Sequence, residues 1–80
     1  MLVYISADIE GVNHITNWDE ATPGKDSYRE FQEQMTAEVK RAAIGARKAG
    51  ADAVFVKDAH DEGCNLIYSE LPDYVVLHRG

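Results

Sequence analysis

The stretch LVYISADIEG, residues 2–11, contains the first element that decides the fold. Residues 2–7 form an apolar run with β-branched and aromatic side chains, and Asp8, Glu10 and Gly11 follow it. A short apolar run bounded by polar residues and glycine predicts a buried β-strand. This strand ends in two carboxylates, two positions apart, directly before a glycine, and the function of those carboxylates is the first question that the sequence poses.

The residues after this strand predict a loop and then a long helix. Residues 11–26 are rich in Asn, Asp, Pro and Gly, which is typical of a loop. Ser27 and Glu30 match the S-x-x-E capping box that begins many helices, and Gly50 is placed to end the helix as its C′ residue. Between them, apolar side chains recur every three or four residues and predict one buried stripe: Tyr28, Phe31, Met35, Val39, Ala42, Ala46 and Ala49.

Two further strands are expected along the chain. The segment ADAVFVKDAH contains a second buried strand over roughly residues 53–57, and YVVLH, residues 74–78, forms a third. The polar segment 61–72 is expected to hold a helical turn or two, capped by Asn65. Short apolar strands joined by helical crossovers predict an α/β fold with a parallel βαβ-type sheet.

Composition and length narrow the class of protein. A chain of 80 residues holds at most one domain, and one helix cannot cover both faces of a three-stranded parallel sheet, so residues 1–80 are expected to be a single α/β segment at the front of a larger domain. The net charge of −6 and the lack of a basic cluster disfavour nucleic acid or an anionic membrane as partner.

Several absences in the sequence bear on location. No apolar run approaches the ~20 residues that span a bilayer, and the N-terminus lacks the pattern of a signal peptide. Cys64 is the only cysteine, so no intrachain disulfide is expected, and we predict it to be a small, half-buried residue rather than a nucleophile. These features lead us to expect a soluble, cytoplasmic protein.

The end of the second strand matches the end of the first. Asp58 and His60 follow the second strand as Asp8 and Glu10 follow the first. In a parallel sheet both carboxyl ends lie at one edge, where open α/β sheets bind ligands. Residues i and i+2 of an extended chain point the same way, so all four side chains are expected to face one crevice, with Gly11 letting the chain turn away sharply.

Three carboxylates and an imidazole in one crevice need a cation or protons to compensate their charge. Carboxylate oxygens with an imidazole nitrogen suit Zn²⁺, Mn²⁺ or Fe, whereas Mg²⁺ or Ca²⁺ would leave His60 unexplained. The alternative is that Asp8 and Asp58 are ordinary strand-ending residues and that His60 is exposed. His14 and His78 stay without an assigned role.

The segments YISADIEGV and VKDAHDEGCNL resemble the DppA-like D-aminopeptidases, peptidase family M55. The shared features are a strand ending in D-x-E-G and a second strand ending in D-x-H, followed shortly by N-L: Asp8, Glu10 and Gly11, then Asp58, His60, Asn65 and Leu66. The resemblance covers nearly all of the chain. It implies a zinc-dependent enzyme that removes N-terminal D-amino acids from short peptides and assembles into a homo-oligomeric ring enclosing its active sites.

The resemblance also implies roles for single residues. Asp8 would bridge two zinc ions, Glu10 would hold one of them and His60 the other. Asp58 is not a ligand by this analogy, and we expect it to orient His60 or a nearby backbone group. The family's other ligands, a histidine and a glutamate, and its catalytic histidine lie beyond the equivalent of residue 80. The activity is therefore expected of the parent chain, and the 80-residue segment alone is expected to be inactive.

Other functions remain open from the residues alone. A haloacid-dehalogenase-type phosphatase has a first strand ending in D-x-D, and Glu10 would misplace its acid/base group. A receiver domain also gathers acids at strand ends but leaves His60 unexplained. The non-enzymatic alternative is a metal-binding interaction module or an inactive relative, which would bind metal without turnover.

Overall fold

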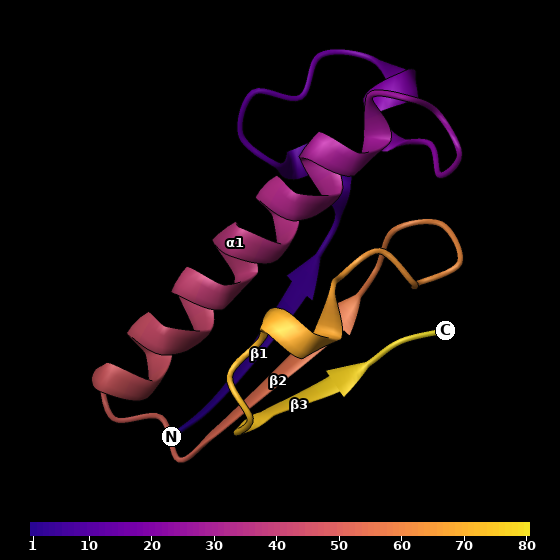
Figure 1. Ribbon diagram of the computed structural model, residues 1–80. Helices are drawn as coiled ribbons and strands as arrows, with labels where there is room; N and C mark the ends of the chain where they lie inside the picture. The colour runs from indigo at the N-terminus through magenta and orange to yellow at the C-terminus, as the bar shows by residue number, and fades with distance from the viewer.

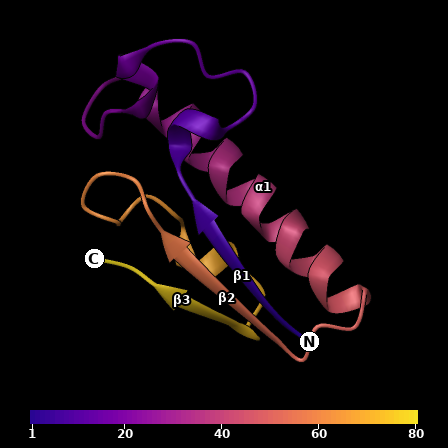
Figure 2. The same cartoon turned by 180° about the vertical axis from the view of Figure 1, so that it is seen from behind.

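The computed structural model describes residues 1–80 as a parallel sheet with one long helix packed on it. The strands β1 (Leu2–Ala7), β2 (Ala53–Asp58) and β3 (Val75–His78) are paired in the order β1-β2-β3. Helix α1 (Tyr28–Lys48) connects β1 to β2 and lies along one face of the sheet (Figure 1), while the view from behind shows the strands side by side with β2 in the middle (Figure 2). The predicted α/β class and the parallel topology are confirmed.

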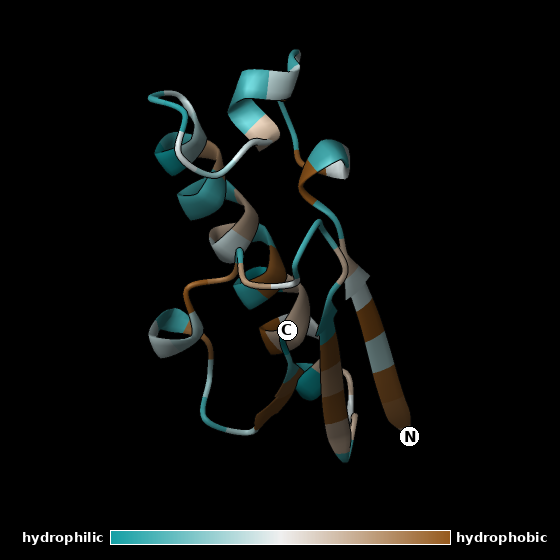
Figure 3. Cartoon of the chain, turned by 90° about the vertical axis from the view of Figure 1, so that its right-hand side faces the viewer, coloured by the Kyte–Doolittle hydropathy of each residue, from teal (hydrophilic) through white to brown (hydrophobic).

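Alternate residues of the strands decide which face of the sheet is buried. Val54 and Val56 of β2 are fully buried, and the strand register places Val3 and Ile5 of β1 directly beside them. The hydrophobic residues form separate bands along the strands in Figure 3. Because one helix covers only one face, large apolar side chains remain exposed on the other face: Leu2, Tyr4 and Val76.

The buried face of α1 follows the predicted stripe at first and then departs from it. The first four predicted positions are buried: Tyr28, Phe31, Met35 and Val39. Ala42 and Ala49 are exposed, and Ala43 is fully buried in place of Ala42. Because a helix has 3.6 residues per turn, Ala43, four residues after Val39, faces the sheet, whereas Ala42, three residues after Val39, is turned away from it.

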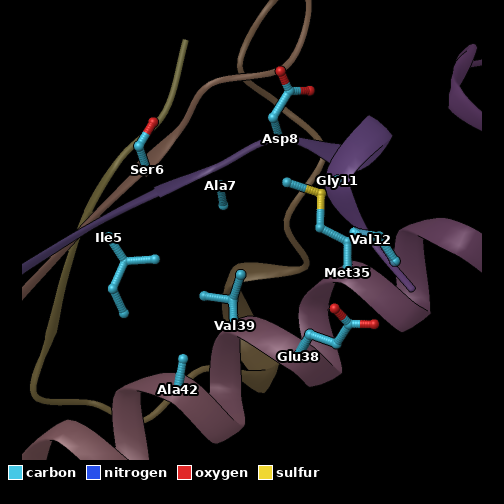
Figure 4. A pocket seen from close by; sticks show the side chains of 10 residues that line it. All are labelled: Ile5, Ser6, Ala7, Asp8, Gly11, Val12, Met35, Glu38, Val39 and Ala42. Carbon is cyan, nitrogen blue, oxygen red and sulfur yellow. The ribbon is translucent and has the colours of Figure 1, made fainter.

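Ala42 instead lines a groove between α1 and the outer edge of β1. The groove has a volume of about 370 Å³ and also receives the side chains of Met35 and Val39. In Figure 4, Ile5 points from β1 toward the helix, whereas Asp8, which also lines the groove, points its carboxylate away from the helix. This groove is therefore a feature of the helix side of the sheet, with the Asp8 carboxylate turned away from the helix.

The sequence predicted the C-terminal end of α1 correctly and its N-terminal cap incorrectly. Gly50 has φ +107°, and the amides of Gly50 and Ala51 each donate at 3.1 Å to the carbonyls of Arg47 and Ala46, which is a Schellman motif. The predicted C′ role of Gly50 is confirmed. The predicted capping box at the start is wrong, because Ser27 has helical backbone angles and its side chain makes no capping bond.

No helix of the structure is both long and apolar enough to cross a membrane.

The segment predicted as a loop, residues 11–26, has one 3₁₀ turn at its start and a second within it. The turn η1 (Ile9–Gly11) begins directly after β1, and η2 (Trp18–Ala21) lies in the middle of the loop. Asn17 accepts a hydrogen bond from the Glu20 amide, and the Glu20 carboxylate accepts one from the Asn17 amide, both at 3.3 Å. The capping box of this protein therefore begins η2, with asparagine as the capping residue.

The crossover from β2 to β3 is anchored on one buried carboxylate. Asp58, which is 1% exposed, accepts hydrogen bonds from the backbone amides of Asn65 and Leu66 at 2.7 Å and from the Asn65 side chain at 2.9 Å. The Tyr28 hydroxyl at the start of α1 donates to Asn65 Oδ1 at 2.6 Å. One carboxylate thus joins the end of β2, the crossover and the helix.

The rest of the crossover differs from the sequence-based expectation. It holds a single 3₁₀ turn, η3 (Tyr68–Glu70), whose N-cap is Ile67 and not Asn65. The predicted capping role of Asn65 is wrong, because its side chain is already bonded to Asp58 and Tyr28. Cys64 is free and exposed rather than half-buried.

Replacing Asp58 with asparagine tests this anchor. The substitution keeps the shape of the side chain but places an N–H₂ group among three N–H donors, so buried donors lose their acceptor. We expect Asp58→Asn to lower the free energy of unfolding of the metal-free protein by about 2–4 kcal/mol, since an unsatisfied buried donor costs about 1–3 kcal/mol. Urea denaturation measures the change.

The matched control is Asp73→Asn, which alters an exposed acid on the same connection, just before β3. It should change the free energy of unfolding by less than about 0.5 kcal/mol. Similar losses in the two variants would contradict the anchoring role of Asp58.

Candidate metal centre

The structure brings Asp8, Glu10 and His60 together at the carboxyl edge of the sheet. The register pairs the last residues of β1 and β2, Ala7 and Asp58, so the residues that follow each strand emerge side by side. One ligand atom from each of the three side chains lies within 4.8 Å of the other two. His60 Nδ1 is 3.1 Å from Asp8 Oδ1 and 2.9 Å from Glu10 Oε1.

The His60 ring is also held from its other side. Its Nε2 lies 2.6 Å from the carbonyl oxygen of Ala21, which can only accept a hydrogen bond. Nε2 therefore carries a proton, and in the neutral ring the lone pair of Nδ1 faces the two carboxylates. Histidines that bind metals usually donate their second N–H to a backbone carbonyl or a carboxylate in this way.

The turn that supplies this carbonyl is the one that the sequence analysis missed. Ala21 is the last residue of η2, and the capping box between Asn17 and Glu20 fixes that turn. The signal was present in the sequence N-W-D-E, because asparagine is as good a capping residue as serine. The glutamate three positions after the asparagine completed it.

The close approach of the two carboxylates and the His60 ring in this cluster shifts the pKa values of Asp8 and His60. The pKa of Asp8 is lowered, chiefly by a hydrogen bond shared with the Glu10 side chain, which outweighs partial burial. Burial acts to lower the pKa of His60, but the hydrogen bond to Ala21 and the nearby Glu10 and Asp8 carboxylates outweigh it and raise the pKa above its ordinary value. The two carboxylates therefore attract positive charge to this point, either a proton on the ring or a cation.

The donor atoms fit zinc in type and spacing. Zinc takes imidazole nitrogen and carboxylate oxygen at about 2.0–2.2 Å, so two ligands of one tetrahedral ion lie roughly 3.3 Å apart. The distance of 3.1 Å between His60 Nδ1 and Asp8 Oδ1 is close to that value, so these two groups can share one ion. The His60 side chain is 11% exposed, whereas the side chains of Asp8 and Glu10 are 53% and 43% exposed. A fixed ring and two accessible carboxylates can together hold a metal ion.

Asp58 does not face this cluster, contrary to the expectation that it would point the same way as His60. The rule that positions i and i+2 share a direction holds only in extended chain, and β2 ends at Asp58. The chain then bends, and Asp61 has φ +50°. Asp58 reaches His60 only through Asn65, whose side chain donates to both Asp58 and the His60 carbonyl. Its orienting role stays a prediction.

Three other residues named from the sequence lie outside the cluster. Gly11 is not in the left-handed region of backbone space, and a Cβ there would meet no atom within 4 Å, so the expected need for glycine is wrong. His14 and His78 are both exposed, and neither belongs to the group of possible ligands. The cluster therefore consists of one residue after β1, one in η1 and one after β2.

A hollow of about 460 Å³ opens beside the cluster. Asp8, Glu10 and His60 line it together with Trp18 and the residues that follow η2. Trp18 is 75% exposed, so it presents an apolar surface next to the two carboxylates. The volume lies within the range of about 300–1,000 Å³ that is usual for small-molecule sites.

Comparisons with known proteins agree with this arrangement. The family model of Peptidase M55, described as D-aminopeptidase, matches residues 1–80. The solved structure described as "Zn-dependent D-aminopeptidase DppA from Bacillus subtilis, a self-compartmentalizing protease" is similar, with a TM-score of 0.96 and 29% sequence identity. The match covers 100% of this chain and 29% of the DppA chain, so this chain spans less than a third of the length of that protein.

A comparison with curated proteins found no match. The family model nevertheless covers every residue of the chain, and the resemblance noted in the sequence is thereby confirmed. The two motifs that carried the resemblance lie at the ends of β1 and β2, where the structure gathers the candidate ligands. This chain belongs to the D-aminopeptidase family, peptidase family M55.

Proposed function

We propose that the whole protein is a zinc-dependent aminopeptidase that releases D-amino acids from the N-terminus of short peptides. The observation that carries this proposal is the convergence of Asp8, Glu10 and His60 at one sheet edge in a chain of the D-aminopeptidase family. The description of the similar DppA structure as zinc-dependent supports the choice of metal. We also propose that the protein acts in the cytoplasm, as expected from the sequence.

We propose that Asp8 bridges two zinc ions, with Glu10 on one ion and His60 on the other. Three side chains cannot complete two zinc sites, because a catalytic zinc usually takes three protein ligands of its own. We therefore place the remaining ligands and the catalytic residue in the part of the whole protein outside residues 1–80. Bound zinc supplies the Lewis acidity that polarises a peptide carbonyl and activates water near neutral pH.

The residues of this chain then perform three tasks. Asp8 and Glu10 supply the negative charge that attracts the cations to the sheet edge. His60 supplies a nitrogen whose direction is set by its hydrogen bond to Ala21. The hollow of about 460 Å³ gives the first residue of a short peptide room beside the cluster, with Trp18 as an apolar wall.

We also propose that the whole protein assembles into a homo-oligomeric ring that encloses its active sites. The description of DppA as a self-compartmentalizing protease supports this. Such an assembly would limit substrates to short peptides, because folded proteins could not enter. Light scattering of the whole protein after size-exclusion chromatography would give its mass, and a monomer would exclude the ring.

The bridging role of Asp8 predicts an order of zinc loss among variants. Asp8→Ala should lower the zinc content of the whole protein more than Glu10→Ala or His60→Ala, because a bridging carboxylate serves both ions. Elemental analysis of the purified variants measures zinc per chain. Asp73→Ala, which alters an exposed acid away from the cluster, is the control and should keep the wild-type content. Full zinc occupancy in Asp8→Ala would refute the bridging assignment.

The activity is tested with pairs of short peptides that differ only in the chirality of the first residue. The zinc-loaded whole protein should release D-alanine from the D-peptide and leave the L-alanine peptide nearly untouched, and amino-acid release measures both. A chelator should abolish the activity, and added zinc should restore it. A preference for the L-peptide would contradict the proposed specificity, and zinc binding without any hydrolysis would favour the binding-module alternative.

A further inference from the structure

We propose that Asn65 is a positioning residue for His60, which holds the backbone of His60 so that its ring stays beside Asp8 and Glu10. The inference deepens the proposed function and rests on it in one respect, namely that His60 is taken as a zinc ligand. The contacts that carry it are present in the fold itself. Asn65 is one of the two residues of the N-L motif, for which the metal centre supplies no direct role.

The Asn65 side chain is buried and uses both ends of its amide. It is 2% exposed, and its Nδ2 donates to the His60 carbonyl at 2.7 Å and to Asp58 Oδ1 at 2.9 Å. Its Oδ1 accepts from the Tyr28 hydroxyl at 2.6 Å. Both N–H groups of the amide are therefore committed, one of them to the backbone of the candidate ligand.

The neighbours of this amide allow only one orientation. The His60 carbonyl and the Asp58 carboxylate are acceptors, so an amide turned by 180° would place its oxygen against two other oxygens. The main chain of Asn65 is fixed as well, because its amide donates to Asp58 at 2.7 Å and its carbonyl accepts from Gln32 at 2.9 Å. Asn65 is thus a rigid support for the groups that it contacts.

The segment that Asn65 supports is a tight turn with unusual backbone angles. The Gly63 amide donates to the same His60 carbonyl at 2.8 Å, and both Asp61 and Gly63 have positive φ, +50° and +75°. A Cβ on Gly63 would lie 3.0 Å from the Asp58 carbonyl oxygen, so the turn is packed closely against the end of β2. A non-glycine residue at positive φ is strained, and such a turn needs fixed contacts to hold it.

Contacts at both ends of His60 therefore determine where its ring points. At the backbone end, the Asn65 side chain and the Gly63 amide hold the carbonyl, and at the ring end the Ala21 carbonyl holds Nε2 at 2.6 Å. With both ends fixed, Nδ1 is left facing Asp8 and Glu10. Loss of the Asn65 contact leaves the Gly63 amide as the remaining donor to the His60 carbonyl, so the backbone end is held less firmly and the ring spends part of its time out of line with the two carboxylates.

The test uses Asn65→Asp in the whole protein. Aspartate has nearly the same shape, but it replaces the N–H₂ group with an oxygen that faces the His60 carbonyl and the Asp58 carboxylate. We expect zinc affinity to fall about 10–100-fold, the usual range when a group that orients a metal ligand is lost. Competition with a chromophoric chelator measures the affinity.

The matched control is Thr36→Val, which removes a buried hydrogen bond from the same crossover. Thr36 is fully buried, and its hydroxyl accepts from the Ile67 amide at 3.1 Å without touching His60. Both variants should unfold at lower urea concentration than the wild type, but only Asn65→Asp should lose zinc affinity. Equal losses of affinity in the two variants would show a general structural effect and overturn the inference.

A second variant covers the case in which Asn65→Asp does not fold. Tyr28→Phe removes only the hydroxyl that orients the Asn65 amide and leaves both Nδ2 bonds in place. It should lower zinc affinity by a smaller factor than Asn65→Asp does. In that case, wild-type affinity in Tyr28→Phe would overturn the inference.

The deciding measurement does not depend on zinc. In the metal-free protein, the ring nitrogen and carbon NMR signals of His60 should move in Asn65→Asp and stay in place in Thr36→Val, with His14 and His78 as internal references. If the His60 signals move in Asn65→Asp but the wild-type protein binds no zinc, the positioning role is supported and the proposed function is refuted. Unmoved signals and unchanged zinc affinity in Asn65→Asp would overturn the positioning role and leave the proposed function standing.

Discussion

The parallel pairing of β1 with β2 is the constraint on which the rest of the structure depends. It aligns Ala7 with Asp58, so that residues 52 positions apart in the sequence, Asp8 and His60, meet at one edge. Because parallel strands cannot be joined by a tight turn, the chain between them forms the long helix α1, which covers the hydrophobic face of both strands. A shift of the register by one residue would place the candidate ligands on different levels of the sheet.

The cluster at this edge is held by contacts that lie outside it. Two exposed carboxylates close to each other are unfavourable unless positive charge compensates them, and the fold supplies a ring that can do so only from one direction. The short turn η2 fixes the ring nitrogen, and the buried pair of Asp58 and Asn65 fixes the backbone below it. A rigid set of supports around the three candidate ligands is the arrangement that metal binding requires, since it spares the ion the cost of ordering its ligands.

Much of the fold could be predicted because local patterns determined it. The apolar runs of the strands, the helical stripe up to Val39 and the glycine that ends α1 each follow from sequence spacing alone. The shift from Ala42 to Ala43 could not be predicted, because it depends on where the helix lies over the sheet. The capping box at Asn17 was present in the sequence, but the composition of the surrounding loop concealed it.

The candidate site could be predicted in part for the same reason. Asp8, Glu10 and His60 follow strands that were easy to recognise, and parallel topology brings strand ends together. The direction of Asp58 could not be inferred, because the rule of alternation fails where β2 ends and the chain bends. The role of the Ala21 carbonyl could not be predicted from side-chain patterns, because the group that contacts His60 Nε2 is a backbone atom of a loop far away in the sequence.

The central claim is that these three side chains bind zinc at the carboxyl edge of the sheet. A crystal structure of the zinc-loaded whole protein, with anomalous scattering recorded on both sides of the zinc absorption edge, tests it most directly. Zinc should lie about 2.0–2.2 Å from carboxylate oxygens of Asp8 and Glu10 and from Nδ1 of His60, with Nε2 still bonded to the Ala21 carbonyl. Zinc bound elsewhere, or bound through Nε2 of a reoriented His60 ring, would contradict it.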